Sequence, residues 1–248
     1  MEVFRTLRFR FAHPILRVIE ASFFFAQTEI SHLVLISATM FHFSFLVTFL
    51  VALATAADDI VVDEDFQETI IFLKKQTTFG QNVFIRGGVG NGTDCKPDEA
   101  PAKDPCAIPI AHLELELDSE TPLRDLWAET DLFLTWGANE TDQPSTALGT
   151  PAQWTTSNQN SDYFHDLNIY GENYWMVHFD MDCSKLPNGF FDFKGYLDGQ
   201  WESDISQAQC TGNMAVTPPY TSNNHIARCG YVNVFEWGGS SCLMEELE

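Results

Sequence analysis

The sequence predicts an all-β protein built as an antiparallel β-sandwich of about seven to eight strands, and three observations lead to this prediction. Residues 174–182 (YWMVHFDMD) alternate apolar and polar side chains with the period of a strand that buries one face. The turn-forming pairs Asn188-Gly189 and Asp198-Gly199 separate the apolar runs that follow. After residue 56, no long stretch shows convincing helical periodicity. Short strands with frequent turns are typical of a sandwich.

Each expected strand has its own pattern. Residues 111–118 (AHLELELD) alternate leucine with mostly acidic side chains, which predicts a half-exposed strand with an acidic outer face. Asp125–Glu129 is expected to form a single helical turn. Nothing between residues 57 and 248 resembles a linker, so we expect one domain. Strands are expected at residues 69–75, 81–86, 111–118, 131–136, 174–182, 190–196 and 231–237, and another begins at Trp201.

Two β-hairpins are expected where the turn-forming pairs lie. The first turn is Leu186–Gly189 and the second is Asp198-Gly199. These hairpins would place Lys194 close to Trp201 on an outer surface, so that an indole plane lies beside a charged hydrogen-bond donor. Such a pair suits a sugar ring, which has an apolar face and a rim of hydroxyl groups.

Residues 1–56 are predicted to be a leader that contains a secretory signal peptide. Several arginines precede an apolar run that begins near Met40 and ends in Ala54-Thr55-Ala56. Small residues in this spacing mark signal-peptidase cleavage, so we expect cleavage after Ala56. The domain of residues 57–248 is therefore expected to be secreted and extracellular.

Two alternatives to this leader stay open. The apolar stretch of residues 32–57 is long enough to span a bilayer, which would make it a single N-terminal membrane anchor with the domain outside. Met40 is also an alternative start. In that case residues 40–56 are the signal peptide and residues 1–39 are an extension of the gene model.

The chain is strongly acidic. It has 35 Asp and Glu residues against 13 Lys and Arg residues, which gives a formal net charge of −22. This charge argues against nucleic acid and against an anionic membrane as partners. Solubility in an extracellular fluid is the simplest explanation for it.

The six cysteines all follow the expected cleavage site, as in proteins of oxidising compartments. Cys95–Cys106 is the one pairing that we predict, because it would close a loop rich in Pro and Asp. No C-x-x-C pair exists and no His has zinc-ligand spacing, so neither a metal site nor a cofactor is expected. Asn91 and Asn139 begin N-glycosylation sequons.

Several segments resemble the starch-binding modules of carbohydrate-binding module family 20. TTFGQNVFI (residues 77–85) resembles the opening of these modules, and Leu148-Gly149 with Trp154 falls about where the family has Leu-Gly and Trp. Tyr174-Trp175, Leu186-Pro187, FDFK (residues 191–194) and WESD (residues 201–204) resemble the later half in the same order. The combined pattern also resembles an accessory C-terminal module of some animal α-amylases, although the domain is too short for an amylase barrel.

The resemblance implies an Ig-like sandwich that binds an α-1,4-glucan such as starch or glycogen and catalyses nothing. Carried over to this sequence, Trp154 and Trp201 would be stacking plates and Lys194 a hydrogen-bond donor, with Glu202 in the same site. The family's Asn-Arg after this motif is replaced by Ser206-Gln207, which removes an expected hydrogen bond.

The resemblance also implies a second sugar site. Phe79 stands where the family has a Tyr, and Tyr170 is the candidate for the second aromatic residue of that site. Phe79 lacks the hydroxyl group, so this second site departs from the family pattern.

Each assignment has a competing interpretation. Trp154 and Trp201 are alternatively core residues, and Lys194 is alternatively a cross-strand ion-pair partner. The fold is alternatively used for another glycan or for a protein partner. Two carboxylate pairs, Asp180 with Asp182 and Glu202 with Asp204, have a spacing that glycosidases use, but an acidic chain produces such pairs readily, so no enzyme is expected. His178 and His225 are expected to be packed or solvated.

Overall fold

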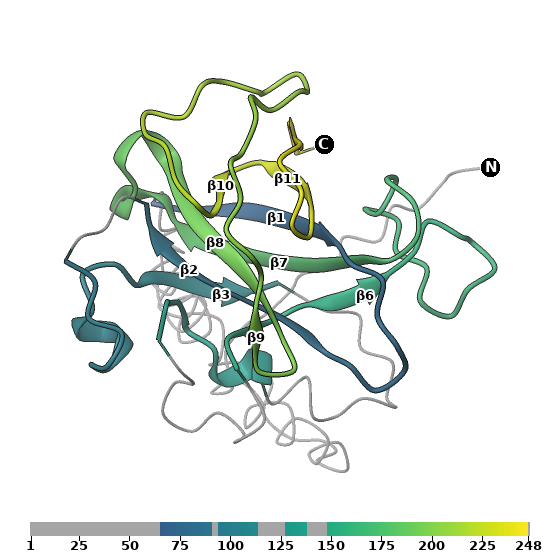
Figure 1. Cartoon of the computed structure of the whole chain (residues 1–248), viewed down its shortest axis with the longest axis horizontal. Helices are drawn as coiled ribbons and strands as arrows, with labels where there is room; N and C mark the ends of the chain where they lie inside the picture. The colour runs from purple at the N-terminus through teal and green to yellow at the C-terminus, as the bar shows by residue number, and fades with distance from the viewer. Residues whose placement is uncertain (1–64, 91–93, 114–126, 138–147, 248) are drawn as a thin grey trace, which may run out of the picture. The chain divides into compact units, whose positions relative to one another are not determined.

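The computed structural model, drawn in Figure 1, describes residues 65–90, 94–113, 127–137 and 148–247. All of these residues belong to one compact unit, Val62–Glu248. The prediction of an all-β sandwich is confirmed, because nearly every described element is a strand in one of two sheets. The expected cleavage after Ala56 and the sequons at Asn91 and Asn139 lie outside the described residues.

The larger sheet contains seven strands: β1 (Phe66–Lys74), β3 (Ile108–His112), β4 (Phe133–Leu134), β6 (Gln153–Thr155), β7 (Tyr174–Asp182), β11 (Val232–Glu236) and β12 (Cys242–Glu245). Their spatial order is β12-β11-β1-β7-β3-β4, and β6 also pairs with β7. β1 and β7 are antiparallel along their whole length. β1 and β11 are parallel, so the prediction of a purely antiparallel sandwich is wrong for this one pair.

The smaller sheet contains five strands: β2 (Val83–Val89), β5 (Thr150–Pro151), β8 (Phe190–Leu197), β9 (Gln200–Trp201) and β10 (His225–Arg228). β8 lies between β10 and β2, β5 forms the edge beside β2, and β9 pairs with β8. The short 3-10 helices η3 (Pro101–Lys103), η4 (Cys183–Lys185) and η5 (Pro187–Gly189) lie in segments that connect a strand of one sheet to a strand of the other. The helical turn expected at Asp125–Glu129 is found at residues 127–130, and the strand expected at residues 111–118 is described only up to His112, as the end of β3.

The inner faces of the two sheets bury the main core. The alternation predicted for β7 is confirmed, since Trp175, Val177 and Phe179 are buried against residues of both sheets. The opposite face of β7 is also covered in part: Met176 lies in a second cluster on the outside of the larger sheet, with Phe72 of β1. Burial of the apolar side chains of both inner faces is what holds a sandwich together.

Only one of the two expected hairpins forms. Asp198 and Gly199, with φ of 50° and 78°, make the predicted two-residue turn, which sets Tyr196 opposite Trp201. The hairpin expected at Leu186–Gly189 is wrong, because β7 belongs to the larger sheet and β8 to the smaller one. Its Asn-Gly pair does adopt the left-handed conformations of a turn, but this turn carries the chain from one sheet to the other.

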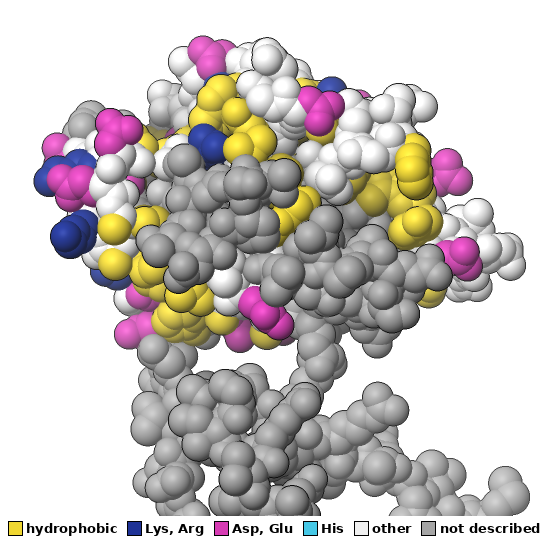
Figure 2. All heavy atoms as spheres, turned by 90° about the horizontal axis from the view of Figure 1, so that it is seen from below, with side chains coloured by type: hydrophobic (Ala, Val, Ile, Leu, Met, Phe, Trp, Pro, Cys, Tyr) yellow, Lys and Arg dark blue, Asp and Glu magenta, His cyan; other side chains and the backbone are white. Residues whose placement is uncertain are grey.

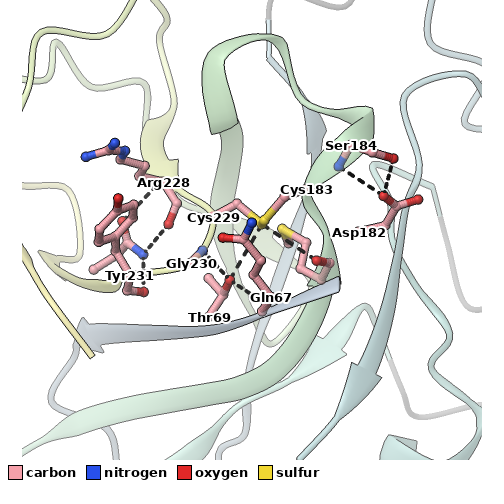
Figure 3. The surroundings of a disulfide bond; sticks show 11 residues. Gln67, Thr69, Asp182, Cys183, Ser184, Arg228, Cys229, Gly230 and Tyr231 are labelled. Atoms are coloured by element: carbon pink, nitrogen blue, oxygen red, sulfur yellow. Dashed lines mark hydrogen bonds between the residues drawn. A yellow bond between two sulfur atoms is a disulfide. The ribbon is translucent and has the colours of Figure 1, made fainter. Parts of the chain in front are cut away.

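Three disulfide bonds cross-link the described residues, and the predicted Cys95–Cys106 pairing is confirmed. Cys183–Cys229 joins the segment after β7 to the end of β10, so it connects the two sheets (Figure 3). The buried hydroxyl group of Thr69 lies beside this bond and accepts a hydrogen bond from the Gly230 N–H. The third bond, Cys210–Cys242, ties the long segment after β9 to β12.

Three disulfides are typical of a protein that folds in an oxidising, extracellular compartment. In the described part of the chain, no helix has both the length and the apolar character needed to cross a membrane.

Candidate carbohydrate-binding surface

Three aromatic rings gather on the outer face of the smaller sheet. Trp201, on β9, is 45% exposed, and its ring centre lies 5.1 Å from that of Tyr196 at nearly a right angle. The indole of Trp136, two residues after β4, lies 6.4 Å from that of Trp201 at a tilt of 38°. We call Trp136, Tyr196 and Trp201 the aromatic platform.

The sheet beneath the platform fixes two of its rings. Tyr196 packs against a small cluster formed by Phe84, Trp127 and Leu148. Trp136 lies over Gly88 of β2, where an added Cβ atom would be 3.1 Å from the indole nitrogen and 2.4 Å from the Cys106 carbonyl oxygen. The absence of a side chain at this position therefore allows the Trp136 segment to lie close to the strand.

Arg86 of β2 lies among these rings. The centre of its guanidinium group is 4.4 Å from the ring centre of Tyr196 and 5.1 Å from that of Trp201, within cation–π range. Its Nε donates a hydrogen bond of 2.8 Å to the Leu148 carbonyl oxygen. Burial lowers the pKa of Arg86 from its ordinary value, although an arginine side chain stays protonated in proteins.

Lys194 does not have the exposed position that the sequence suggested. It lies directly opposite Arg86 in the β2–β8 ladder, but only 9% of it is exposed. Its ammonium group forms an ion pair with Asp204, whose side chain is 72% exposed. The prediction that Lys194 is an accessible donor beside Trp201 is therefore wrong, and Arg86 is the cation that lies against that ring.

Glu202 is also placed differently, although it follows Trp201 directly. It is 2% exposed, and its carboxylate accepts hydrogen bonds from the Gly195 N–H (2.9 Å), the Gly238 N–H and the His225 Nε2 (2.9 Å). Burial alone would raise the pKa of Glu202, but these hydrogen bonds and the nearby His225 outweigh it and lower the pKa. The prediction that Glu202 contacts sugar is wrong for this structure, where it is a buried anchor behind the platform.

The other predicted plate, Trp154, lies on the larger sheet. It sits on β6 opposite Trp175 of β7, partly buried against the main core, and Tyr163 packs edge-on against its ring at 5.2 Å. The structure therefore places Trp154 and Trp201 on different sheets rather than in one pair.

The two residues of the expected second site have contrasting environments. Phe79 lies in the loop between β1 and β2 and is fully exposed (106%). Tyr170 is packed 5.2 Å from Phe72, and its hydroxyl group donates a 2.7 Å hydrogen bond to Glu245. Tyr170 is therefore part of the packing on the outside of the larger sheet, and its hydroxyl group is already used.

Three of the four carboxylates considered for hydrolysis have other partners. Asp182 accepts hydrogen bonds from the backbone and hydroxyl groups of Ser184. Glu202 and Asp204 are separated by their partners, His225 for the first and Lys194 for the second. His178 contacts Glu68 at 2.8 Å on the surface, while His225 is fully buried and contacts Glu202.

One group of potential metal-ligating side chains occurs among the described residues: Cys95, Asp104 and Cys106. Both sulfur atoms belong to a disulfide bond, so they offer no thiolate ligand. One Asp104 oxygen accepts hydrogen bonds from the backbone N–H groups of Lys96 and Cys106. This arrangement holds the disulfide loop in shape and does not build a metal site.

Sequence reasoning missed Trp136, Tyr196 and Arg86 as site residues. The alternation in QNVFIR does place Arg86 on the same strand face as Phe84, and the Asp-Gly turn does set Tyr196 opposite Trp201. Nothing local could have found Trp136, which comes from a distant segment.

On the face seen in Figure 2, hydrophobic side chains gather in several places with basic and acidic groups close by. A comparison with models of known protein families gives no match, and a comparison with curated protein sequences gives none either.

Proposed function

We propose that this domain is a secreted, non-catalytic carbohydrate-binding module that binds α-1,4-glucan on the aromatic platform, with Arg86 as hydrogen-bond donor. The observation that carries the proposal is the exposed indole of Trp201 beside a second, tilted indole and a guanidinium group. Rings of this kind stack on the apolar face of a sugar, while the cation donates hydrogen bonds to its hydroxyl rim.

The size of the platform supports a modest affinity. A sugar that covers roughly 100 Å² of apolar ring surface gains about 2–3 kcal/mol before ordering costs. Two such contacts and a few hydrogen bonds give dissociation constants on the order of micromolar to millimolar. A repeating glucan compensates for weak single contacts, because each glucose unit presents the same face again.

Secretion is part of the proposal. The three disulfide bonds and the expected signal peptide both support an extracellular location. The resemblance of WESD and TTFGQN to starch-binding modules supports the choice of α-glucan as the first ligand to test.

Retention on granular starch and on an amylose resin tests this function. The full chain, produced through a secretory route so that its disulfides form, is expected to bind both materials. Trp201→Ala is expected to weaken binding about tenfold or more, because it removes the most exposed ring of the platform. Phe79→Ala is the comparison variant, since it removes a fully exposed ring from the loop between β1 and β2, where the resemblance implies a second site.

Three results would contradict the proposal in different ways. If Phe79→Ala abolishes retention and Trp201→Ala does not, the contact surface lies at the β1–β2 loop. If the wild-type chain is not retained, α-glucan is not its ligand, and another glycan or a protein partner becomes the first candidate. Release of reducing sugar from soluble starch would show that the domain is catalytic.

A further inference from the structure

The guanidinium group of Arg86 is held in a fixed position with part of its donor capacity unused. Its Nε donates a hydrogen bond to the Leu148 carbonyl oxygen, and its central carbon lies 4.4 Å from the ring centre of Tyr196 and 5.1 Å from that of Trp201. Among the described residues, neither of its two terminal amino groups has a hydrogen-bond partner. A planar fork that is already oriented loses little entropy when it binds a ligand.

The charges around Arg86 favour an anion. Within the described ranges, no carboxylate pairs with Arg86, although the chain carries 35 acidic residues against 13 basic ones. The facing residue in the ladder is Lys194, a second cation, and Asp204 pairs with Lys194. Among the described residues, the outer face of β2 and β8 thus places Arg86 and Lys194 side by side, with Asp204 paired to Lys194 and Asp192 hydrogen-bonded to Ser222 and Asn224.

We infer that Arg86 recognises an anionic group, a carboxylate, sulfate or phosphate, on a saccharide that stacks on Trp201. The inference rests on the proposed function, because it concerns the same platform and narrows the class of glycan. A guanidinium fork binds the paired oxygens of such groups with two parallel hydrogen bonds, which a neutral hydroxyl rim matches less well.

A matched pair of polymers tests the inference. Soluble amylose and the same amylose oxidised to a carboxylate at C6 differ only in the charged group. Affinity electrophoresis of the full chain is expected to show binding to the oxidised polymer about tenfold tighter at low salt, with a smaller difference at high salt. The affinities for the same amylose bearing sulfate esters or phosphate esters, compared with that for the carboxylate form, show which of the three anions binds most tightly.

Two substitutions of Arg86 separate charge from geometry. Arg86→Gln is expected to abolish the preference for the charged polymer, and Arg86→Lys is expected to keep only part of it, because a lysine keeps the charge without the fork. Arg228→Gln is the matched control. It removes the same charge from another arginine that stacks on a ring, Tyr231 at 4.0 Å, but it lies beside Phe190 at the far end of β8.

The outcomes distinguish this inference from the proposed function. Equal or tighter binding of neutral amylose by the wild-type chain would overturn the inference and leave the proposed function standing. A preference for the oxidised polymer that survives in Arg86→Gln, or that disappears equally in Arg228→Gln, would also overturn it. Failure to bind either polymer would overturn the proposed function itself. Near-ultraviolet circular dichroism confirms that each variant is folded.

Discussion

The outer faces of the two sheets both carry aromatic residues, but they use them differently. On the smaller sheet, Trp201 stands exposed beside Trp136 and Arg86. On the larger sheet, Tyr170 packs on Phe72 and its hydroxyl group is bound to Glu245. Further apolar side chains, including Leu243 of β12 and Leu247, pack against the same cluster on the outside of the larger sheet.

This difference shows that residue type alone does not make an aromatic ring a ligand contact. Both outer faces belong to sheets whose inner faces pack on the same main core, and both contain rings near charged groups. What differs is how much of each ring is packed against neighbouring side chains. The smaller sheet leaves Trp201 accessible, whereas the ring of Tyr170 lies within a cluster.

Two carboxylates, one on each sheet, also have pKa values shifted in opposite directions. Hydrogen bonds lower the pKa of Glu202 behind the platform. Burial, and then the negative charge of Glu68 on the facing strand, raise the pKa of Asp180 on the larger sheet. The first carboxylate therefore stabilises the fold when ionised, and the second is destabilising when ionised.

Removing the Cys183–Cys229 disulfide bond, which connects the two sheets, should lower the stability of the domain the most. Cys183→Ala with Cys229→Ala is expected to lower the free energy of unfolding by about 4 kcal/mol, from the chain entropy of its 46-residue separation. Denaturant unfolding followed by tryptophan fluorescence and by far-ultraviolet circular dichroism measures this loss. Both probes should report one transition, and two separate transitions would show that the two faces unfold independently. The shorter Cys95–Cys106 loop, with a separation of 11, is the control, with an expected loss of about 3 kcal/mol.

Glu202→Gln should have the next largest effect, a loss of about 3 kcal/mol at neutral pH, because a buried acceptor of three hydrogen bonds loses its charge. The lowered pKa means that this stabilisation is complete above the ordinary value of 4.5 and is lost as the pH falls through the folded-state value. The difference between wild type and variant should therefore shrink in acid. Urea unfolding at several pH values measures it, and a difference that grows below pH 4.5 would contradict the assignment.

Tyr170→Phe should separate the two faces most clearly. Loss of the hydrogen bond to Glu245 is expected to cost about 1 kcal/mol of stability and to leave glycan binding unchanged. Trp201→Ala should have the reverse pattern, with weaker glycan binding and little change in stability. Tyr163→Phe is the control, since this tyrosine is exposed and its loss of a hydroxyl should change neither property. Reduced glycan retention by a folded Tyr170→Phe variant would place a contact on the larger sheet.

Asp180→Asn should change stability the least, and it should raise stability where the other substitutions lower it. Because the folded-state pKa is raised, ionised Asp180 lowers stability at neutral pH, and its neutral replacement should raise the melting temperature slightly. The gain is expected to stay below about 0.5 kcal/mol, since solvent screens this partly exposed group. Added salt should reduce the gain further, and a decrease in melting temperature would contradict the assigned sign.

Local patterns predicted much of this fold because their causes are local. The alternation of β7 requires one buried face, and Asp198-Gly199 accepts the backbone angles of a tight turn. Cys95 and Cys106 are close in sequence, so their pairing followed from the loop between them. The Asn188-Gly189 turn was recognised for the same reason, but its local geometry does not decide whether the next strand stays in the same sheet.

By itself, the sequence determined the all-β fold class, the buried face of β7, the Asp198-Gly199 turn and one disulfide bond, but it did not indicate the strands β5, β6, β10 and β12. Only the tertiary structure decided that Lys194 pairs with Asp204, that Glu202 points into the core, and that Trp136 reaches Trp201. The physical reason is that a period of two assigns a side chain to a face of a strand. Which distant segment then packs on that face depends on contacts between residues far apart in the chain, and no local pattern encodes them.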